Sequence, residues 1–547
     1  MNENSKDDVK DDIKNVLSYH DASKHHFHRF ARGPGYLDWR TQPDPFLRYD
    51  GAALFELERF SLSEGPRYDV VFAEGALDPE PVNARSVSRL FYDSLAISAW
   101  KQAGGEKWAL RVNPSSGNLH PTEGYLVCGP VEGLNEQPAV CHYAPREHAL
   151  EKRAVFSLET WGKLTAGLPE TTLLVGLTSI HWREAWKYGE RAFRYCHLDV
   201  GHVVAALSIA ASGLGWKVVL LDGPGTRQLA ALLGVSGRGE TEPEHPDCLL
   251  AVFPSGLEVG QPSIPDELTG DLEDLGWFGT PNVLSPGHID WPAIAEAAKA
   301  TVKPSTSGSY GTGLPAARPI LPVREGVFLH KVVHQRRSAQ IMDSTGEISP
   351  DDLYRMLVRT IPAAGVVPFN ALPWDPAVHL VLFVHRVKGI ERGLYILIRD
   401  PNEKEDLISS FRDEFEWKKP ERCPEKLEFY RLALGDLGSV SKDISCHQDI
   451  AADSCFSLGM LVRFETSLKN HGAWFYPRLY WECGMIGQIL YLEAEACGIR
   501  GTGIGCFFDD EFHSLLGLKD LRYQSFYHFT VGKPVHDTRV TTLPAYP

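Results

Sequence analysis

The sequence predicts an α+β protein made of two tandem copies of one fold. Three observations lead to this prediction: the chain has 547 residues, helix and strand patterns mix irregularly along it, and several elements near its middle recur near its end. A chain of this length exceeds what one hydrophobic core normally holds. Helices and strands that mix without strict βαβ alternation favour the α+β class over a doubly wound sheet.

Composition narrows the class of protein. The chain is 43% hydrophobic and 23% charged, as expected of a globular protein. Its formal net charge of −16 argues against nucleic-acid or anionic-membrane partners. The sequence has no run of about 18 apolar residues, so no membrane-spanning helix is expected. Ten scattered cysteines and an acidic start without a targeting pattern indicate a cytoplasmic protein.

Four segments are expected along the chain. Residues 1–84 form an N-terminal arm, 85–257 a first domain, 258–320 a linker and 321–547 a second domain. The linker is indicated by the Ser-, Gly- and Pro-rich stretch 303–319, because such a composition cannot bury a core.

The two domains resemble each other toward their ends. Each has a long apolar helix pattern, a Gly-rich turn, a short helix ending in L-L-G and an apolar strand. In the first domain the helices and the strand are expected at 193–216, 229–235 and 248–256, and in the second at 478–501, 513–518 and 527–535. The shared order and spacing indicate a duplication.

Shorter elements precede this repeated series. The first domain is expected to hold a helix at about 86–101 and strands near 108–112 and 124–128. The second is expected to hold a helix at 350–358 and strands at 378–385 and 393–398.

Three segments carry groups suited to a binding site. Arg111 to Glu123 reads RVNPSSGNLHPTE, a turn whose hydroxyl and amide groups can approach a flat polar ligand. Arg336-Arg337-Ser338, expected just before a helix, offers adjacent guanidinium groups to a phosphate. The third segment, Gly501 to Asp510, reads GTGIGCFFDD. Because its glycines follow a helix, the context is wrong for a Rossmann dinucleotide loop.

Together with KYGERAFRY (Lys187 to Tyr195) and the helix containing Gly201-His202, these segments resemble the nitroreductase superfamily, specifically its SagB-type dehydrogenase branch. The resemblance implies an α+β fold that binds FMN noncovalently, usually at an interface between two copies. It also implies that NAD(P)H could serve as an electron donor.

The resemblance assigns the FMN site to both domains. In related dimers one subunit supplies a Pro-Ser-Ser-x-Asn turn, and the other supplies an Arg-x-Ser segment and a late Gly turn. The implied cofactor-binding residues are Arg111, Pro114, Ser115, Ser116 and Asn118 in the first domain, and Arg336, Arg337, Ser338, Gln340, Gly503, Ile504 and Gly505 in the second. The chain would act as a monomeric pseudo-dimer, with higher oligomers left open.

The reciprocal site is expected to be incomplete. Where the second domain should repeat the Ser-rich turn it reads IPAAGVVPFN (Ile361 to Asn370), with alanines in place of hydroxyls. Where it should repeat Lys-Tyr it reads HGAWFYPRLY (His471 to Tyr480), without a lysine. One FMN site per chain is therefore predicted.

Lys187 and Tyr188 are the candidate catalytic residues. In SagB-type enzymes that oxidise azoline rings in peptides, a Lys-Tyr pair at this point is linked to catalysis. Removing a hydride from carbon requires removal of a proton as well, and either side chain could accept it. The structural alternative is that Lys187 pairs with Glu184 or Glu190 on a helix. Glu190, Arg191 and Arg194 are expected to form structural ion pairs, with Arg194 facing a substrate as the alternative.

No metal site is expected. His20, His25, His26 and His28 lack a framework of cysteines or carboxylates, so solvated side chains are predicted. Three functions stay open: an FMN-dependent dehydrogenase or oxidase of a small molecule or modified peptide, an NAD(P)H-dependent nitro or quinone reductase, and a non-enzymatic flavin-binding protein.

Overall fold

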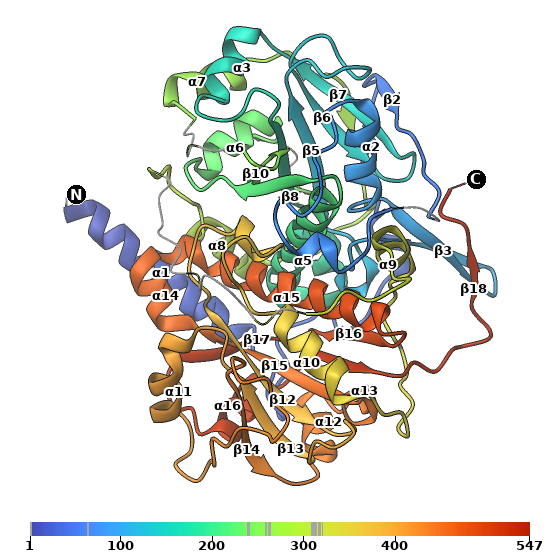
Figure 1. Cartoon of the computed structure of the whole chain (residues 1–547). Helices are drawn as coiled ribbons and strands as arrows, with labels where there is room; N and C mark the ends of the chain where they lie inside the picture. Colours follow the sequence, from blue (N-terminus) through green and yellow to red (C-terminus); the bar gives the residue numbers. More distant parts are fainter. Residues whose placement is uncertain are drawn as a thin grey trace.

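The computed structural model describes residues 3–62, 65–237, 241–257, 260, 264–307, 314, 319 and 321–546. Two α+β halves are stacked in Figure 1, the first coloured blue to green and the second yellow to red. Each half contains an antiparallel sheet, and one long helix from each half lies between the two sheets. The prediction of two tandem α+β domains is confirmed.

The first sheet has seven antiparallel strands in the order β2-β7-β6-β5-β8-β10-β9. Its strands are β2 (Leu54–Glu56), β5 (Thr122–Cys128), β6 (Ala139–Ala144), β7 (Ala149–Val155), β8 (Leu173–Ser179), β9 (Trp216–Leu220) and β10 (His245–Pro254). The central strands β5 and β8 are buried at every position because both faces of the sheet are covered, which explains their continuous apolar sequence.

The second sheet repeats this order as β14-β13-β12-β15-β17-β16, again antiparallel throughout. Its strands are β12 (Val378–Val384), β13 (Gly393–Leu397), β14 (Phe429–Leu434), β15 (Phe456–Arg463), β16 (Arg500–Ile504) and β17 (Tyr523–Gly532). Six strands thus have counterparts in the other half, and β2 is an extra edge strand of the first sheet.

Helices also accompany each sheet, with more of them in the second half than in the first. The first half has α2 (Ala84–Tyr92), α3 (Leu158–Leu164), α4 (His181–Tyr188), α5 (Ala192–Gly213) and α6 (Thr226–Leu233). The second has α9 (Leu329–Gln335), α10 (Pro350–Arg359), α11 (Lys404–Ser410), α12 (Gly438–Ile444), α13 (Asp449–Asp453), α14 (Phe464–His471), α15 (Tyr476–Ala496) and α16 (Asp509–Leu516). The predicted L-L-G endings are the left-handed caps Gly234 of α6 and Gly517 of α16.

Three local predictions are wrong. The helix expected at 86–101 ends at Tyr92, and β3 (Ile97–Ala103) follows, because β3 pairs with β4 (Glu106–Arg111) and with the C-terminal strand β18 (Thr541–Leu543). The expected Gly-rich turn at 501–505 is the edge strand β16. Arg336 follows helix α9 rather than preceding a helix, because its guanidinium group turns toward the first half.

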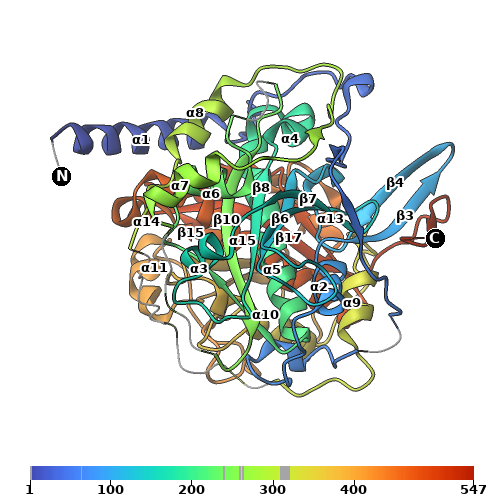
Figure 2. The ribbon, with the colours of Figure 1, turned by 90° about the horizontal axis from the view of Figure 1, so that it is seen from above.

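The two ends of the chain each lie against the other half. The arm begins with helix α1 (Glu3–Ala22), and His20 reaches Tyr476 and Gln524 of the second half. At the other end, β18 extends the β3–β4 hairpin of the first half, as Figure 2 shows at its right edge. The histidines His20 and His25 are buried rather than solvated as predicted.

The segment expected as a linker, 258–320, contains regular structure. Helix α7 (Asp266–Glu273) packs on α6, β11 (Thr280–Pro281) pairs with β1 (Tyr49–Asp50), and α8 (Pro292–Ala300) packs on α1 and α5. Most of the Ser-, Gly- and Pro-rich stretch, at 308–313 and 315–318, lies outside the described residues.

Helices α5 and α15 cross in backbone contact at two glycines. A Cβ at Gly201 would lie 2.1 Å from the Trp481 carbonyl oxygen, and a Cβ at Gly484 would lie 2.1 Å from the Leu198 carbonyl oxygen. Leu198 precedes Gly201 by three positions, as Trp481 precedes Gly484, so the crossing is two-fold symmetric. Counting from these glycines therefore pairs each residue of α5 with a counterpart in α15.

The same region forms the apolar core. The largest apolar cluster of the described residues runs through both halves and includes most of α5 and α15. By length and hydropathy alone the helical stretch His181–Gly213 could cross a membrane, but 94% of its apolar window is buried inside the protein.

Replacing Gly201 with alanine should destabilise the protein. In an ordinary helix interior this change stabilises by roughly 0.5–1 kcal/mol. At Gly201 the added methyl group meets a carbonyl oxygen, so we expect a loss of about 1–3 kcal/mol or more. Thermal unfolding of the variant measures the effect.

Gly162→Ala in α3 is the matched control, because a Cβ there meets nothing within 4 Å. We expect its melting temperature to equal or exceed that of the wild type. A Gly201→Ala variant as stable as Gly162→Ala would show that the two helices do not need their close crossing.

Candidate functional site

The Ser-rich segment forms a tight turn held by its own side chains. It leaves β4 and contains the short 3₁₀ helix η3 (Ser116–Asn118). The Asn118 amide donates to the Ala109 carbonyl at 2.8 Å, and the Ser115 hydroxyl accepts from the His120 backbone N–H at 2.8 Å. Gly117 has a φ of 59°, a left-handed conformation that glycine adopts without strain. The turn therefore presents partly exposed hydroxyl groups on a fixed backbone.

The side-chain ends of Lys187 and Tyr188 lie against this turn. They occupy the last turn of α4, and both are half-buried. A Cβ on Gly117 would lie 2.6 Å from the Tyr188 hydroxyl and 3.2 Å from Lys187 Nζ. Burial, with the nearby Glu184 carboxyl group, raises the pKa of Tyr188 well above its usual value. Tyr188 thus stays protonated, which suits a hydrogen-bond donor better than a base.

An aromatic pair links this turn to the second half. Tyr188 packs edge-on against Tyr195, with ring centroids 4.8 Å apart. Tyr195 in turn lies against Gly505, where a Cβ would lie 2.5 Å from the tyrosine ring. The absence of a side chain at Gly505 lets the two halves meet here.

The Arg-Arg-Ser segment reaches the same turn from the second half. Arg336 donates to the backbone carbonyls of Val112 and Arg111, at 3.2 and 2.9 Å, just before the turn begins. Arg337 donates to the Ser98 hydroxyl at 3.2 Å. Both guanidinium groups therefore bond to neutral oxygens.

Positive charge gathers around these arginines. Burial, followed by repulsion from Arg336 and Arg500, lowers the pKa of Arg337 to about 10. Burial, again with Arg337 and Arg500, lowers the pKa of Lys101. Glu495 is the nearby carboxyl group, and burial raises its pKa. Glu495 forms an ion pair with Arg500 at 3.9 Å, and among the described residues Lys101, Arg336 and Arg337 form none, so cations outnumber carboxylates here.

The glycines of β16 lie beside this cluster. A Cβ at Gly503 would lie 1.8 Å from the Tyr527 hydroxyl, so only glycine fits. Tyr491 joins the strand to the Arg-Arg-Ser segment, because its hydroxyl accepts from the Gly503 backbone N–H at 2.8 Å and bonds to the Ser338 hydroxyl at 2.9 Å. Ile504, between the glycines, is buried.

Most of the predicted cofactor residues are thus brought together, from both halves. Two lie less centrally. Arg111 is buried, and its guanidinium group is bonded to the Pro45 carbonyl of the arm. Gln340 is exposed beyond the Arg-Arg-Ser segment. Pro114 is buried at the base of the turn.

Sequence reasoning missed two buried carboxyl groups at the turn. Ser115 Oγ donates to Glu184 Oε1 at 3.4 Å, and the Ser116 backbone N–H donates to Asp199 Oδ1 at 3.2 Å. The available signal was an aspartate inside an otherwise apolar helix, since Asp199 lies between Leu198 and Val200 in α5. It also missed Tyr195, Tyr491 and Tyr527, whose positions depend on tertiary contacts.

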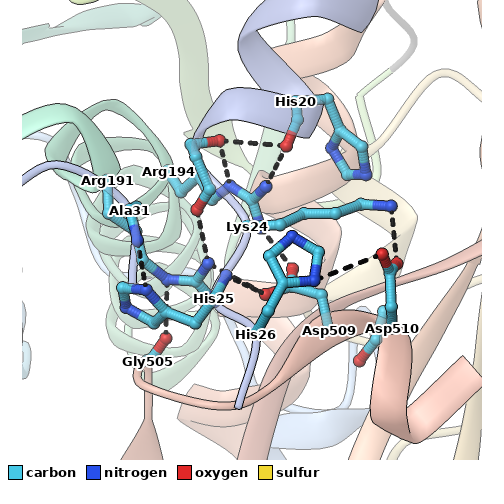
Figure 3. Close-up of polar contacts among 12 residues, drawn as sticks. His20, Lys24, His25, His26, Ala31, Arg191, Arg194, Gly505, Asp509 and Asp510 are labelled. Carbon is cyan, nitrogen blue, oxygen red and sulfur yellow. Dashed lines mark hydrogen bonds and ion pairs between the residues drawn. The ribbon is translucent and has the colours of Figure 1, made fainter. Parts of the chain in front are cut away.

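Arg191 and Arg194 hold the arm and both halves together, as predicted for structural ion pairs. Figure 3 shows both guanidinium groups on the Asp509 carboxylate, at 3.0 and 2.7 Å, with the His25 backbone N–H on the same group. Arg191 Nε also donates to the Gly505 carbonyl at 3.1 Å. Although burial opposes it, these arginines keep the pKa of Asp509 below its usual range. The network fixes Gly505 relative to α5.

The reciprocal position carries different side chains. By the symmetry of the helix crossing, Arg478 on α15 is the counterpart of Tyr195, and Asp222 after β9 is the counterpart of Gly505. Arg478 and Asp222 form a buried ion pair where the other side has a tyrosine against a glycine.

Other counterparts differ in the same sense. Gly215 and Gly498 both have left-handed backbones at the ends of the long helices, which sets the register of β9 against β16. In that register Val218 and Leu220 replace Gly501 and Gly503, and Asn470-His471 replaces Lys187-Tyr188.

The counterpart of the Ser-rich turn is bonded to the first half. The Asn370 amide donates to Glu74 Oε2 at 2.9 Å, and the Glu74 backbone N–H donates to the Gly365 carbonyl at 2.9 Å. The short helix η5 (Phe369–Ala371) packs directly on β9. The polar groups of this turn are therefore bonded to the first half, and the turn packs against β9.

Comparison with known proteins agrees with this architecture. A protein of Methanocaldococcus jannaschii named as a nitroreductase is 25% identical over 145 residues, which are 25% of this chain and 68% of that protein. The crystal structure of a nitroreductase-family protein from Anabaena variabilis covers 95% of this chain and 99% of its own, with a TM-score of 0.70 and 20% identity, so the fold is shared along almost the whole length.

The family model described as "Nitroreductase family" matches residues 76–252 and 393–533, one region in each half and together more than half of the chain. The first region contains the Ser-rich turn and Lys187-Tyr188, the second contains the glycines of β16, and Arg336 to Gln340 lie between the two regions. This chain therefore belongs to the nitroreductase family.

Proposed function

We propose that the chain is an FMN-dependent oxidoreductase with one flavin site built from both halves. The observation that carries this proposal is the bond between the two predicted parts of the site. Arg336 of the second half donates to the carbonyls of Arg111 and Val112, which lead into the Ser-rich turn of the first half. The predicted phosphate-binding segment and the polar turn are thus bonded to each other, which supports one shared site.

The cation cluster fits a phosphate group. Arg336 and Arg337 are bonded to neutral oxygens, and neighbouring cations and burial lower the pKa of Arg337 to about 10. An anion relieves this repulsion and forms charge-assisted hydrogen bonds with the guanidinium groups. Arg336, Arg337 and Ser338 would hold the phosphate.

The glycine strand and the turn are proposed to hold the flat ring system of FMN. Tyr527 and Tyr195 lie directly against Gly503 and Gly505, so aromatic rings and bare backbone line this side. Ser115, Ser116 and Asn118 would supply hydrogen bonds to polar ring edges from the other side. When bound, FMN would supply two-electron redox chemistry.

Lys187 and Tyr188 are proposed to handle the substrate proton. Their polar ends meet beside Gly117, the exposed position of the turn. Tyr188 retains its proton because burial raises its pKa, so it can orient the substrate as a donor. Lys187 then serves as the group that accepts or returns the proton.

The substrate is proposed to be a small molecule or a modified peptide, as the SagB-type resemblance implies, in a cytoplasmic setting. NAD(P)H-dependent reduction of nitro compounds or quinones is the alternative for the same site. Anaerobic mixing with NADPH, followed by the loss of flavin absorbance, distinguishes the two functions. Rapid bleaching of the flavin by NADPH favours the reductase, and bleaching by a thiazoline-containing peptide favours the dehydrogenase.

FMN titrated into the flavin-free chain should saturate at one FMN per chain. The Arg478–Asp222 pair and the residues Val218 and Leu220 leave the reciprocal position without its glycines and hydroxyls. The flavin released by denaturation is measured by its visible absorbance. A ratio near two would contradict the asymmetric site.

The substitution Arg336→Ala should weaken the binding of FMN more than the binding of riboflavin. A charge-assisted hydrogen bond contributes about 1.5–3 kcal/mol, so the Kd for FMN should rise roughly 10- to 100-fold, while riboflavin, which lacks the phosphate, should change little. Flavin fluorescence measures both affinities. Arg539→Ala, at an exposed ion pair with Asp537, is the control. Equal losses for both flavins would mean that Arg336 supports the fold rather than the phosphate.

The Lys187→Ala variant should bind FMN as the wild type does but reduce the flavin much more slowly. Loss of a proton-transfer group typically costs about 10²- to 10⁴-fold in rate. Stopped-flow absorbance follows flavin bleaching by the thiazoline peptide or by NADPH, whichever reduces the wild type. Lys163→Ala, at an exposed pair with Glu159, is the control. An unchanged rate in the Lys187 variant would leave only the helix-pairing role for this residue.

A further inference from the structure

Two acidic side chains meet beneath the Ser-rich turn. Glu184 lies on α4 one turn before Lys187, and Asp199 lies on α5. Glu184 is fully buried and Asp199 is 2% exposed. Both bond to the same dipeptide, Glu184 through the Ser115 hydroxyl and Asp199 through the Ser116 backbone N–H.

Each carboxyl group has one oxygen without a partner. In the part of the chain that the structure describes, Glu184 Oε2 and Asp199 Oδ2 are buried and have no hydrogen-bond partner. A buried carboxyl oxygen without a donor disfavours the ionised form, and two neighbouring carboxyl groups disfavour it further. Such a pair is stable when it retains a proton.

The electrostatics agree with this geometry. Burial, followed by the charge of Asp199, raises the pKa of Glu184 well above its usual value. Burial raises the pKa of Asp199 to about 7, although its bonds to Ser115 and Ser116 lower it. The titratable groups that act on the pair or respond to it are Arg183, Lys187 and Tyr188 of α4, Cys196 of α5, Arg111 of β4 and Tyr527 of β17.

The acid at the equivalent position of α15 has different partners. The counterpart of Asp199 on α15 is Glu482, which forms a buried ion pair with Arg399 and accepts from the Ala377 backbone N–H at 3.0 Å. The counterpart of Glu184 is Ser467. Among the described residues Asp199 forms no ion pair, although Arg111 is near enough to act on its charge. Of the two equivalent positions, the carboxyl pair without an ion pair is found at the one beside Lys187.

We propose that Glu184 and Asp199 share an exchangeable proton and form the proton store that serves Lys187. This inference rests on the proposed function, because the store is useful only where a substrate gains or loses a proton. Both residues act through Lys187 and the Ser-rich turn, so they are positioning residues rather than catalytic ones.

The store balances the redox step in either direction. Dehydrogenation removes a hydride and a proton from the substrate; FMN, when bound, would supply the hydride acceptor, and the amine of Lys187 would take the proton. Lys187 passes its proton to the Glu184–Asp199 pair, whose one carboxylate becomes a neutral acid, and the lysine is free to act again. In a reduction the same proton moves from the acid to the substrate.

The pH dependence has a definite sign. Asp199 must be ionised to accept a proton, and this form predominates above about pH 7. The rate of flavin bleaching by a dehydrogenation substrate should therefore rise with pH through neutrality. Substituting Asp199→Asn should remove this rise and slow the step by about 10²-fold, with FMN affinity kept within threefold.

Infrared difference spectroscopy of the purified chain tests the store without relying on activity. The wild type should show the C=O band of a protonated carboxyl group that titrates near neutral pH, shifts in D₂O and disappears in Asp199→Asn. Glu184→Gln should remove a second protonated band. Asp247→Asn is the control, because burial raises the pKa of Asp247 to about 8 at a position away from Lys187.

The outcomes separate this inference from the proposed function. The titrating band is assigned by its loss in Asp199→Asn or in Glu184→Gln and by its persistence in Asp247→Asn, so the test stands if one of the first two variants fails to fold. A wild type without a protonated band attributable to either residue, or an Asp199→Asn enzyme with the wild-type pH profile, overturns the store while FMN-dependent turnover stands. If the chain shows the titrating band but binds no FMN, the proposed function is wrong and the shared proton is still supported.

Discussion

The backbone contact between α5 and α15 is the constraint on which the rest of the structure depends. Gly201 and Gly484 each place bare backbone against a carbonyl of the other helix, at symmetric positions. This contact sets the distance between the halves, and the distance decides what can meet across the interface. It allows Arg336 to reach the carbonyls of Arg111 and Val112, and Tyr195 to reach Gly505. A wider crossing would leave the Ser-rich turn and the arginine segment as two incomplete surfaces.

The scaffold is symmetric, and the side chains placed on it are not. A two-fold crossing creates two equivalent positions, and this chain treats them differently. At one position small residues and tyrosines leave polar groups accessible. At the other, Arg478 and Asp222 neutralise each other, and Val218 and Leu220 occupy the strand. Loss of either partner would leave an uncompensated buried charge and destabilise the protein, so each of these two side chains has its charge neutralised by the other rather than by a ligand.

Sequence reasoning succeeded where the signal is local. The L-L-G endings, the long helices and the strands at 124–128 and 378–384 follow from periodicity and cap chemistry, which act within a few residues. It failed where distant contacts decide the outcome. The strand β3 exists because it pairs with residues 541–543 at the far end of the chain. Glu184 and Asp199 are visible as acids, but only the fold brings both onto Ser115 and Ser116.

One flavin is proposed to lie between parts of the two halves. A crystal structure of the chain grown with excess FMN tests this arrangement. We expect electron density for one flavin between the turn at Asn113 to Asn118 and the strand at Gly501 to Gly505, with its phosphate against Arg336 to Ser338. Density between Val218 to Asp222 and Ile361 to Asn370, or equal density at both positions, would contradict it.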